Sequence, residues 1–254
     1  MGSKKSQEEL FFRKVNQKVG KCIQKYGLIT EGDRILVGLS GGKDSMVLLE
    51  TLAGRLKYHP QSYELAAVHI SLRSQPYRID LAYLSEFAAN LNIPFIHQIL
   101  DIDLFHQENN NPCFVCSWNR RKALFEAAHK LGYNKLALGH QQDDAIETLL
   151  MNMVFQSSIS SMPPSLSMFD GKLHLIRPLL LVPENEVKQF AALKNFRNEL
   201  KTCTFEKDSK RKDIKKIIGQ LSELNPNIRS NVYSSMTNIQ REYLPGEPFR
   251  AIRK

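Results

Sequence analysis

The stretch RILVGLSGGKDS, residues 34–45, decides the fold class. Its first half is a short apolar run that predicts a buried strand, and its second half is a glycine-rich turn leading into a helical pattern. Glycines let the backbone turn tightly, and the N–H groups at the start of a following helix are unpaired and carry partial positive charge. The stretch therefore predicts an anion site for phosphates, to which the hydroxyls of Ser40 and Ser45 add donors. The alternative is an ordinary tight turn, and a Walker A loop is excluded because aspartate follows the lysine where Ser or Thr is required.

Strand-like and helix-like segments alternate around this stretch. A helical pattern over 8–26 comes first. Strands are then expected at 34–39, 64–70, 94–99 and 135–138, and helices at 44–55, 78–91, 114–131 and 143–155. Such alternation predicts an α/β fold, a doubly wound parallel sheet with helices on both faces.

The alternation stops near residue 156. Residues 157–168 are rich in Ser and Pro and are expected to form a loop or a lid, while 173–176 is expected to add one strand. Helical stretches follow at 184–196, 207–223 and 226–240. The chain is thus expected to comprise an N-terminal helix (1–30), an α/β domain (31–180) and a helical, basic C-terminal region (181–254).

Composition and charge narrow the class of protein. The 254 residues are 42% hydrophobic and 24% charged, which excludes disordered and collagen-like chains. We expect a soluble cytoplasmic protein with no membrane association, because no apolar run reaches the roughly 18–20 residues of a membrane span. The net charge of +9 comes from residues 1–26, 197–216 and 241–254. This distribution favours basic arms that hold a polyanion, although solvated helix faces would give the same pattern.

A second polar string, LGHQQDD at residues 138–144, also lies between a predicted strand and a helix. Carboxyl ends of parallel strands face the ligand crevice of an open sheet, so this string should lie beside the glycine-rich turn. Adjacent aspartates at a helix start often serve only as caps. Capping is compatible with catalysis, because one carboxylate can cap while the other reaches a metal.

The four cysteines leave several interpretations open. Cys22 lies on the apolar face of the first helix and is expected in the core. Cys113 and Cys116 form a C-x-x-C, which could be a redox pair, part of a zinc site or part of an iron–sulfur site. The position in the chain disfavours a thioredoxin-like pair, and the lack of a second C-x-x-C disfavours zinc. Cys203 is the remaining cysteine.

The string SGGKDS at residues 40–45 resembles the pyrophosphate loop of the N-type ATP pyrophosphatase (PP-loop) superfamily. The resemblance implies an adenine nucleotide α-hydrolase-like fold, binding of ATP, transfer of AMP to a substrate oxygen, and release of pyrophosphate. It also implies that Asp44 helps to hold Mg²⁺, a hard cation that takes oxygen ligands. The implied nucleotide-binding residues of this loop are Ser40, Gly41, Gly42, Lys43, Asp44 and Ser45.

A closer resemblance rests on PCFVCSWNRR at 112–121, GHQQDD at 139–144, MPP at 162–164 and IRPL at 176–179. Together with a later cysteine, these strings look like the tRNA 2-thiocytidine synthetase family. That family converts an anticodon-loop cytidine to 2-thiocytidine, using ATP, Mg²⁺ and a [4Fe–4S] cluster held by three cysteines. The implied cluster ligands are Cys113, Cys116 and Cys203. The implied catalytic residues are Asp44, Arg120, Asp143 and Asp144, and Gly139 and His140 are implied at the nucleotide.

The chain departs from the family pattern at two places. Glu206 stands where many members carry a further cysteine, and Gln141 and Gln142 stand where His-Arg is frequent. The resemblance implies tRNA, a sulfur donor such as a cysteine desulfurase system and a reductant as partners, and a homodimer is possible. Two rival functions are a lysidine-type tRNA ligase, which needs no C-x-x-C, and a non-thiolating tRNA-binding iron–sulfur protein.

Overall fold

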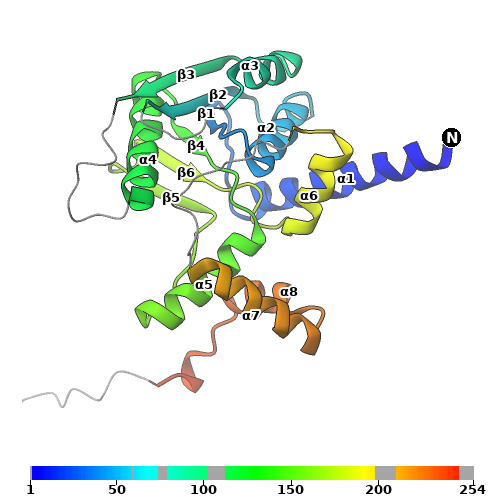
Figure 1. Cartoon of the computed structure of the whole chain (residues 1–254), viewed down its shortest axis with the longest axis vertical. Helices are drawn as coiled ribbons and strands as arrows, with labels where there is room; N and C mark the ends of the chain where they lie inside the picture. The colour runs from blue at the N-terminus through cyan, green and yellow to red at the C-terminus, as the bar shows by residue number, and fades with distance from the viewer. Residues whose placement is uncertain (1, 59, 74–78, 102–111, 198–209, 246–254) are drawn as a thin grey trace, which may run out of the picture.

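A six-stranded sheet lies at the centre of the structure, a computed structural model that describes residues 2–58, 60–73, 79–101, 112–197 and 210–245. The strand order is β3-β2-β1-β4-β6-β5 (Figure 1). All neighbouring strands are parallel except β5, which pairs antiparallel with β6. The strands are β1 (Asp33–Gly38), β2 (Tyr63–Leu72), β3 (Phe95–Leu100), β4 (Lys135–Ala137), β5 (Ser165–Met168) and β6 (Leu173–Ile176). The predicted doubly wound α/β fold is confirmed.

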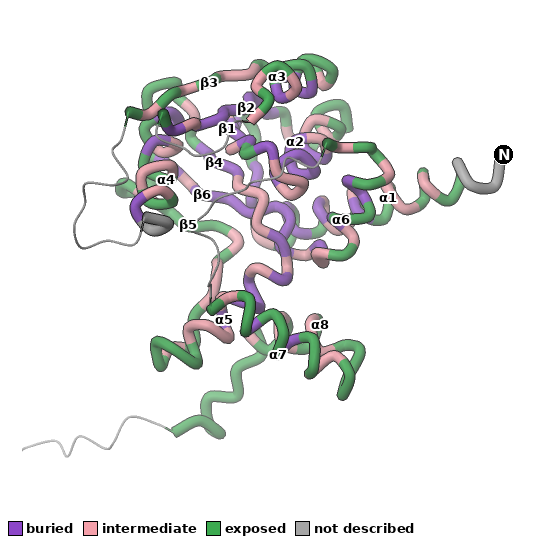
Figure 2. The backbone as a smooth tube through the Cα atoms, in the orientation of Figure 1, coloured by how far each residue is buried: buried purple, intermediate pink, exposed green. Residues whose placement is uncertain are grey.

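Helices cover both faces of this sheet. Helices α1, α2, α3 and α6 lie on one face, and α4 covers the other (Figure 1). Side chains of β1 alternate between the two layers: Ile35 and Val37 pack with the first group, and Leu36 packs under α4. Burial on both faces explains the nearly continuous apolar run of β1, and Figure 2 shows the buried centre of the sheet. The bounds of these helices are α1 (Gly2–Lys25), α2 (Lys43–Arg55), α3 (Leu81–Asn90), α4 (Pro112–Lys130) and α6 (Glu184–Leu193).

Three further helices form a separate layer below the sheet. Helix α5 (Gln142–Gln156) leaves the end of β4 and packs against α7 (Lys210–Leu224) and α8 (Ile228–Ser235) (Figure 1). Their small core is formed by Ile146, Ile214 and Ile218. A short 3₁₀ turn, Arg241–Tyr243, follows.

The helix contacts cross the boundary expected at residue 180. Helix α6 belongs to the C-terminal region in sequence, yet it packs on α1 and α2 of the sheet layer. Helix α5 precedes the boundary, yet it packs with α7 and α8. The division into 1–30, 31–180 and 181–254 stays a prediction about domains.

The segment 157–168 was expected to be a loop or a lid, and this is wrong for its last four residues. Ser165–Met168 forms the edge strand β5. The strand is mostly exposed and pairs on one side only. Its sequence SLSM does alternate polar and apolar residues, but over only four positions that directly follow Pro163 and Pro164. Among the described helices, none is long and apolar enough to cross a membrane.

Candidate active site

Two loops meet at the carboxyl ends of the central strands. One leads from β1 into α2, and the other leads from β4 into α5. Strands β1 and β4 are neighbours where the strand order reverses, which is the ligand-binding position of doubly wound sheets. A Cβ atom at Gly139 would lie 2.8 Å from the backbone carbonyl carbon of Asp44 and 2.9 Å from the backbone nitrogen of Ser45. The expected adjacency of the two strings is therefore confirmed, and the approach is close enough to require glycine.

The loop after β1 comprises residues 39–45 and is here called the glycine loop. Hydrogen bonds of its two serines fix its conformation. The Ser40 N–H donates to Ser45 Oγ at 3.1 Å, and Ser45 Oγ donates to the Gly42 carbonyl at 2.9 Å. Gly41 adopts a φ of +79°, in the left-handed region that favours glycine. This arrangement brings the loop to the N-terminus of α2, where the first N–H groups and the helix dipole attract anions.

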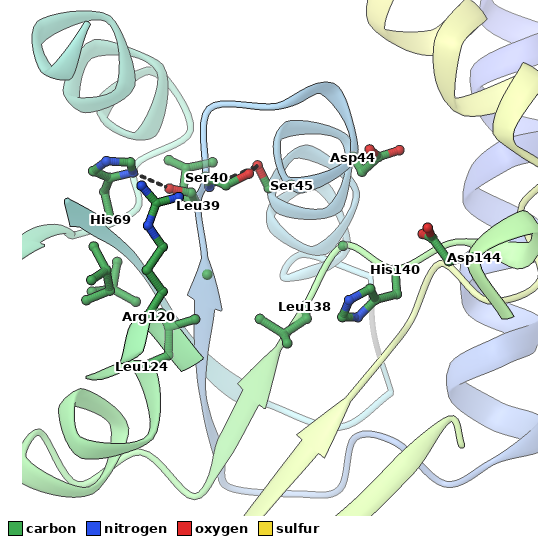
Figure 3. A pocket seen from close by; sticks show the side chains of 14 residues that line it. Leu39, Ser40, Asp44, Ser45, His69, Arg120, Leu124, Leu138, His140 and Asp144 are labelled. Carbon is green, nitrogen blue, oxygen red and sulfur yellow. Dashed lines mark hydrogen bonds between the residues drawn. The ribbon is translucent and has the colours of Figure 1, made fainter. Parts of the chain in front are cut away.

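A pocket of about 310 Å³ opens between the two loops. Figure 3 shows Asp44 and Ser45 on one wall, Asp144 and His140 on the second loop, and Arg120 reaching in from α4. The remaining wall is largely apolar. The lining residues are Gly38, Leu39, Ser40, Asp44, Ser45, Val68, His69, Ile70, Arg120, Leu124, Leu138, Gly139, His140 and Asp144.

Two carboxylates, Asp44 and Asp144, line this pocket. Burial raises the pKa of Asp144, and the nearby Asp44 charge raises it further, against Arg211, which lies 3.5 Å away and lowers it. Asp44 is paired with Lys43 at 3.0 Å. Repulsion between two carboxylates is relieved when a cation lies between them, so the pair suits a hard divalent cation whose other ligands are phosphate oxygens. Among the described residues, no group of three or more His, Cys, Asp or Glu gathers as a ready-made metal site.

Asp143 takes a different place from its neighbour. Its Oδ2 accepts from the Glu184 N–H at 2.7 Å, and its Oδ1 accepts from Arg229 Nε at 2.7 Å. It does not line the pocket. Asp144 instead closes the cap of α5, since its Oδ2 accepts from the Gln141 N–H at 3.0 Å. Asp143 therefore joins α5 to α6 and α8, whereas Asp144 faces the pocket and also caps the N-terminus of α5.

His140 is held neutral. Burial lowers its pKa to about 4, and the positive charge of Arg177 adds to this shift. Arg177 Nε donates to His140 Nδ1 at 3.3 Å, so Nδ1 is the acceptor and Nε2 carries the proton. The ring thus offers a neutral N–H donor beside the glycine loop.

An ion network that sequence reasoning missed connects the glycine loop with α7. Glu184 lies 3.7 Å from Lys43 and 2.8 Å from Lys215, measured between side-chain nitrogen and oxygen. Glu147, whose side chain is only 5% exposed, lies 3.4 Å from Arg211 and 3.9 Å from Lys215. Lys215 and Lys188 lower the pKa of Glu184 although burial opposes them. A single sequence offers no signal for such pairs, because the partners lie far apart along the chain.

The cysteines divide into a core thiol and a helix-borne pair. Cys22 is buried, its Sγ lies 3.7 Å from the Arg177 carbonyl, and burial raises its pKa to about 12. This confirms its predicted place in the core. Cys116 is half-buried in α4, one turn before Arg120. Cys113 also belongs to α4, but its side chain lies outside the described residues, as does Cys203.

Comparison with known proteins identifies relatives that match most of the chain. A family model described as a PP-loop domain matches residues 11–219. A protein of Geobacter sulfurreducens is 35% identical over 247 residues, covering 93% of this chain and 94% of its own. A protein of Syntrophotalea carbinolica is 36% identical over 243 residues, covering 93% of each. Both are named tRNA-cytidine(32) 2-sulfurtransferase.

A solved structure agrees with this fold. It is the U34-tRNA thiolase NcsA from Methanococcus maripaludis with its [4Fe-4S] cluster, with a TM-score of 0.77 and 23% identity. The match covers 95% of this chain and 82% of that one, and at this identity it supports the fold alone. The family model matches most of the chain, and both relatives match it over more than nine-tenths of their own length. The chain therefore belongs to the PP-loop domain family and, within it, to the family of the tRNA-cytidine(32) 2-sulfurtransferases.

Proposed function

We propose that this protein is an ATP-dependent tRNA sulfurtransferase that converts an anticodon-loop cytidine to 2-thiocytidine. The observation that carries the proposal is the pocket in which the glycine loop and the string 139–144 meet, in a chain about one-third identical to enzymes of that name. The pocket has the features that adenylation requires: an anion site at a helix start, two carboxylates and a neighbouring arginine.

The proposed ATP site uses both walls of the pocket. The phosphates would be bound by the N–H groups and hydroxyls of Ser40, Gly41, Gly42, Lys43 and Ser45, with Gly139 and His140 against them. The apolar side chains of Val68 and Ile70 suit the adenine ring. Asp44 and Asp144 would hold Mg²⁺, since carboxylate oxygens are its preferred ligands, and the ion would neutralise phosphate charge.

The proposed reaction has two steps. First, the cytosine O2 attacks the α-phosphorus of ATP, and pyrophosphate departs. The O2 atom, a poor leaving group by itself, now leaves C2 readily as part of AMP. Then a sulfur nucleophile bonds to C2, and AMP departs with the former O2. Arg120 stabilises negative charge on the transferring phosphoryl group, for which a guanidinium has suitable geometry. Asp143 was expected in catalysis; its bonds to Arg229 and Glu184 favour a positioning role.

The [4Fe–4S] cluster of the family would be held by Cys113, Cys116 and Cys203. The described part of the chain fits this donor set, because Cys116 is a half-buried thiol on the same helix as Arg120, which lines the pocket. Positions 113 and 116 are three apart in α4 and share one helix face. Held by three protein thiolates, the cluster would keep one iron without a protein ligand and would supply a site for the sulfur.

The bound tRNA would lie along the C-terminal helices. Helix α7 carries the exposed side chains of Lys210, Lys212 and Lys216. It packs against α5, the helix that contributes Asp144 to the pocket. The target base must leave the stack of the anticodon loop, which a single-stranded loop allows at low cost. We further propose a cytoplasmic enzyme, possible as a homodimer, that receives sulfur from a cysteine desulfurase system and electrons from a reductant.

Nucleoside mass spectrometry of tRNA from a deletion strain tests this function. The strain should lack 2-thiocytidine, and the wild-type gene should restore it. The purified protein should release pyrophosphate from ATP only when tRNA is present. Retained 2-thiocytidine in the deletion strain would refute the assignment, and release of AMP that depends on free lysine would favour a lysidine-type ligase.

A further inference from the structure

A second pocket lies on the outer face of α4, away from the proposed ATP site. Its volume of about 640 Å³ is within the range of roughly 300–1,000 Å³ that is typical of small-ligand sites. It is bounded by α4 and by the β5–β6 hairpin, which lie next to each other in Figure 1. We call it the outer pocket. Its lining residues are Trp118, Arg121, Lys122, Phe125, Glu126, His129, Tyr133, Met168, Phe169, Lys172 and Leu173.

Exposed aromatic rings dominate the outer pocket. Trp118 is 51% exposed and Phe169 is 57% exposed, and both line this one pocket. Phe169 is fixed edge-to-face against Phe125, with ring centroids 6.0 Å apart and an interplanar angle of 78°. The Phe169 ring is therefore held in place with a solvent-facing surface, as in a stacking platform.

The hairpin presents Phe169 through an unusual turn. Phe169 and Asp170 have φ values of 53° and 56°, and the Gly171 N–H donates to the Met168 carbonyl at 3.2 Å. This is a type I′ turn, whose central positions favour Asn, Asp or Gly. A phenylalanine is disfavoured there, because its Cβ crowds the backbone at a positive φ. The turn thus places an aromatic side chain at a position where stability alone would select another residue.

Positive charge surrounds these rings. Arg121, Lys122 and Lys172 line the outer pocket, and Glu126 is the single carboxylate among its lining residues. Lys122 lies 5.6 Å from the centroid of the Trp118 ring. Aromatic faces combined with cations suit an unpaired nucleobase together with its flanking phosphates, as in proteins that bind single-stranded nucleic acid.

We propose that the outer pocket binds an unpaired base of the substrate RNA, stacked on Trp118 and Phe169. The proposal rests on the proposed function, since it takes the RNA to be the tRNA substrate. Arg120 of α4 reaches the ATP pocket, while Trp118 and Arg121 of the same helix line the outer pocket. An α-helix with its side chains is about 10–12 Å wide, a width that a single-stranded loop can span. The stacked base anchors the loop, and a different base enters the ATP pocket.

Trp118 provides a direct test, because it is the single tryptophan of the chain. The whole protein is titrated with an unstructured heptaribonucleotide, and the indole fluorescence is excited at a wavelength that tyrosine does not absorb. Stacking should quench this fluorescence. An abasic ribose–phosphate chain of the same length, which keeps the charge but has no bases, should leave it unchanged.

A matched pair of variants locates the stacking surface. Phe169→Asn removes the ring and supplies a residue that the turn favours, so the fold is kept. It should weaken binding of the heptaribonucleotide roughly five- to hundredfold, which corresponds to the loss of one stacked base. Tyr58→Ala removes another exposed aromatic ring, 85% exposed and beyond α2 on the other face of the sheet, and should leave binding unchanged.

Three outcomes would overturn the proposal. RNA that binds, as measured by anisotropy, while Trp118 fluorescence stays constant would place the RNA elsewhere. Equal quenching by the abasic chain would show that the pocket binds phosphates through its positive charges and does not stack a base. Shielding of Trp118 that grows with protein concentration, together with sedimentation as a dimer, would show that a second copy covers the pocket. Thiolation of whole tRNA by the wild-type protein, measured in parallel, reports on the proposed function separately.

Discussion

Replacing Gly139 by alanine should damage the active site by a calculable displacement. The added Cβ would lie 2.8 Å from the Asp44 carbonyl carbon and 2.9 Å from the Ser45 nitrogen, both backbone atoms that cannot rotate away. Ordinary contact begins near 3.4 Å, so the two loops must separate by about 0.6 Å. A misplacement approaching 1 Å lowers catalysis by roughly 10²-fold, and such overpacking costs about 1–3 kcal/mol of stability.

Two other glycine variants serve as controls, because an added Cβ meets less resistance there than at Gly139. A Cβ at Gly38 would lie 3.0 Å from Leu138 Cδ2, the end of a flexible side chain, so Gly38→Ala should have a weaker effect. A Cβ at Gly54 meets nothing within 4 Å, so Gly54→Ala in α2 should keep activity and gain up to about 1 kcal/mol. The assays are tRNA-dependent pyrophosphate release and thermal unfolding. Wild-type kcat/KM and Tm in Gly139→Ala would refute the reasoning.

Four further predictions concern single side chains. Asp44→Asn should abolish Mg²⁺-dependent turnover with an unchanged circular dichroism spectrum, and preserved turnover would exclude the metal role. Asp143→Asn should lower the unfolding free energy by about 1–3 kcal/mol in denaturant titration, because it weakens the bonds to Arg229 and Glu184. The His140 pKa of about 4 lies below the ordinary 6.5, so on acidification the unfolded chain takes up a proton before the folded protein does. The free energy of unfolding should therefore fall by up to about 3 kcal/mol between pH 6.5 and pH 4. His140→Gln should remove this dependence of stability on pH. Cys116→Ala should lose iron after anaerobic purification while ATP binding survives, and Cys22→Ala should keep its iron; equal iron in both would reopen the zinc and redox alternatives.

The fold was predictable because its strongest signals are local. The apolar run of β1, the glycine loop and the helical spacing after it lie within about twenty residues of one another. Edge strand β5 was missed, because its Ser-Leu-Ser-Met alternation covers only four positions beside two prolines and the strand depends on pairing with β6. The same limit applies to α5 and α6, whose packing partners are set by contacts distant in sequence.

The sequence predicted which segments form the site, but not the place of each side chain within it. The meeting of the glycine loop with residues 139–144 followed from the rule for carboxyl ends of parallel strands. The distinct places of Asp143 and Asp144 did not follow, because adjacent positions in a helix point about 100° apart and the sequence does not state which one faces the pocket. The pairing of Glu147 with Arg211 was also inaccessible, since their attraction depends on the docking of α7 on α5.

That docking means that a shortened chain would not retain an intact nucleotide-binding half. Removing everything after α6 would delete Arg211, Lys215 and Arg229 together. Glu147 and Asp143, with side chains 5% and 8% exposed, would then lose their cationic partners, and a carboxylate left without compensation at such a site is strongly destabilising. Lys43 would remain beside a Glu184 that no longer contacts α7. Helices α7 and α8 thus supply the counterions of carboxylates in the half that carries the glycine loop, so the two halves form one folding unit.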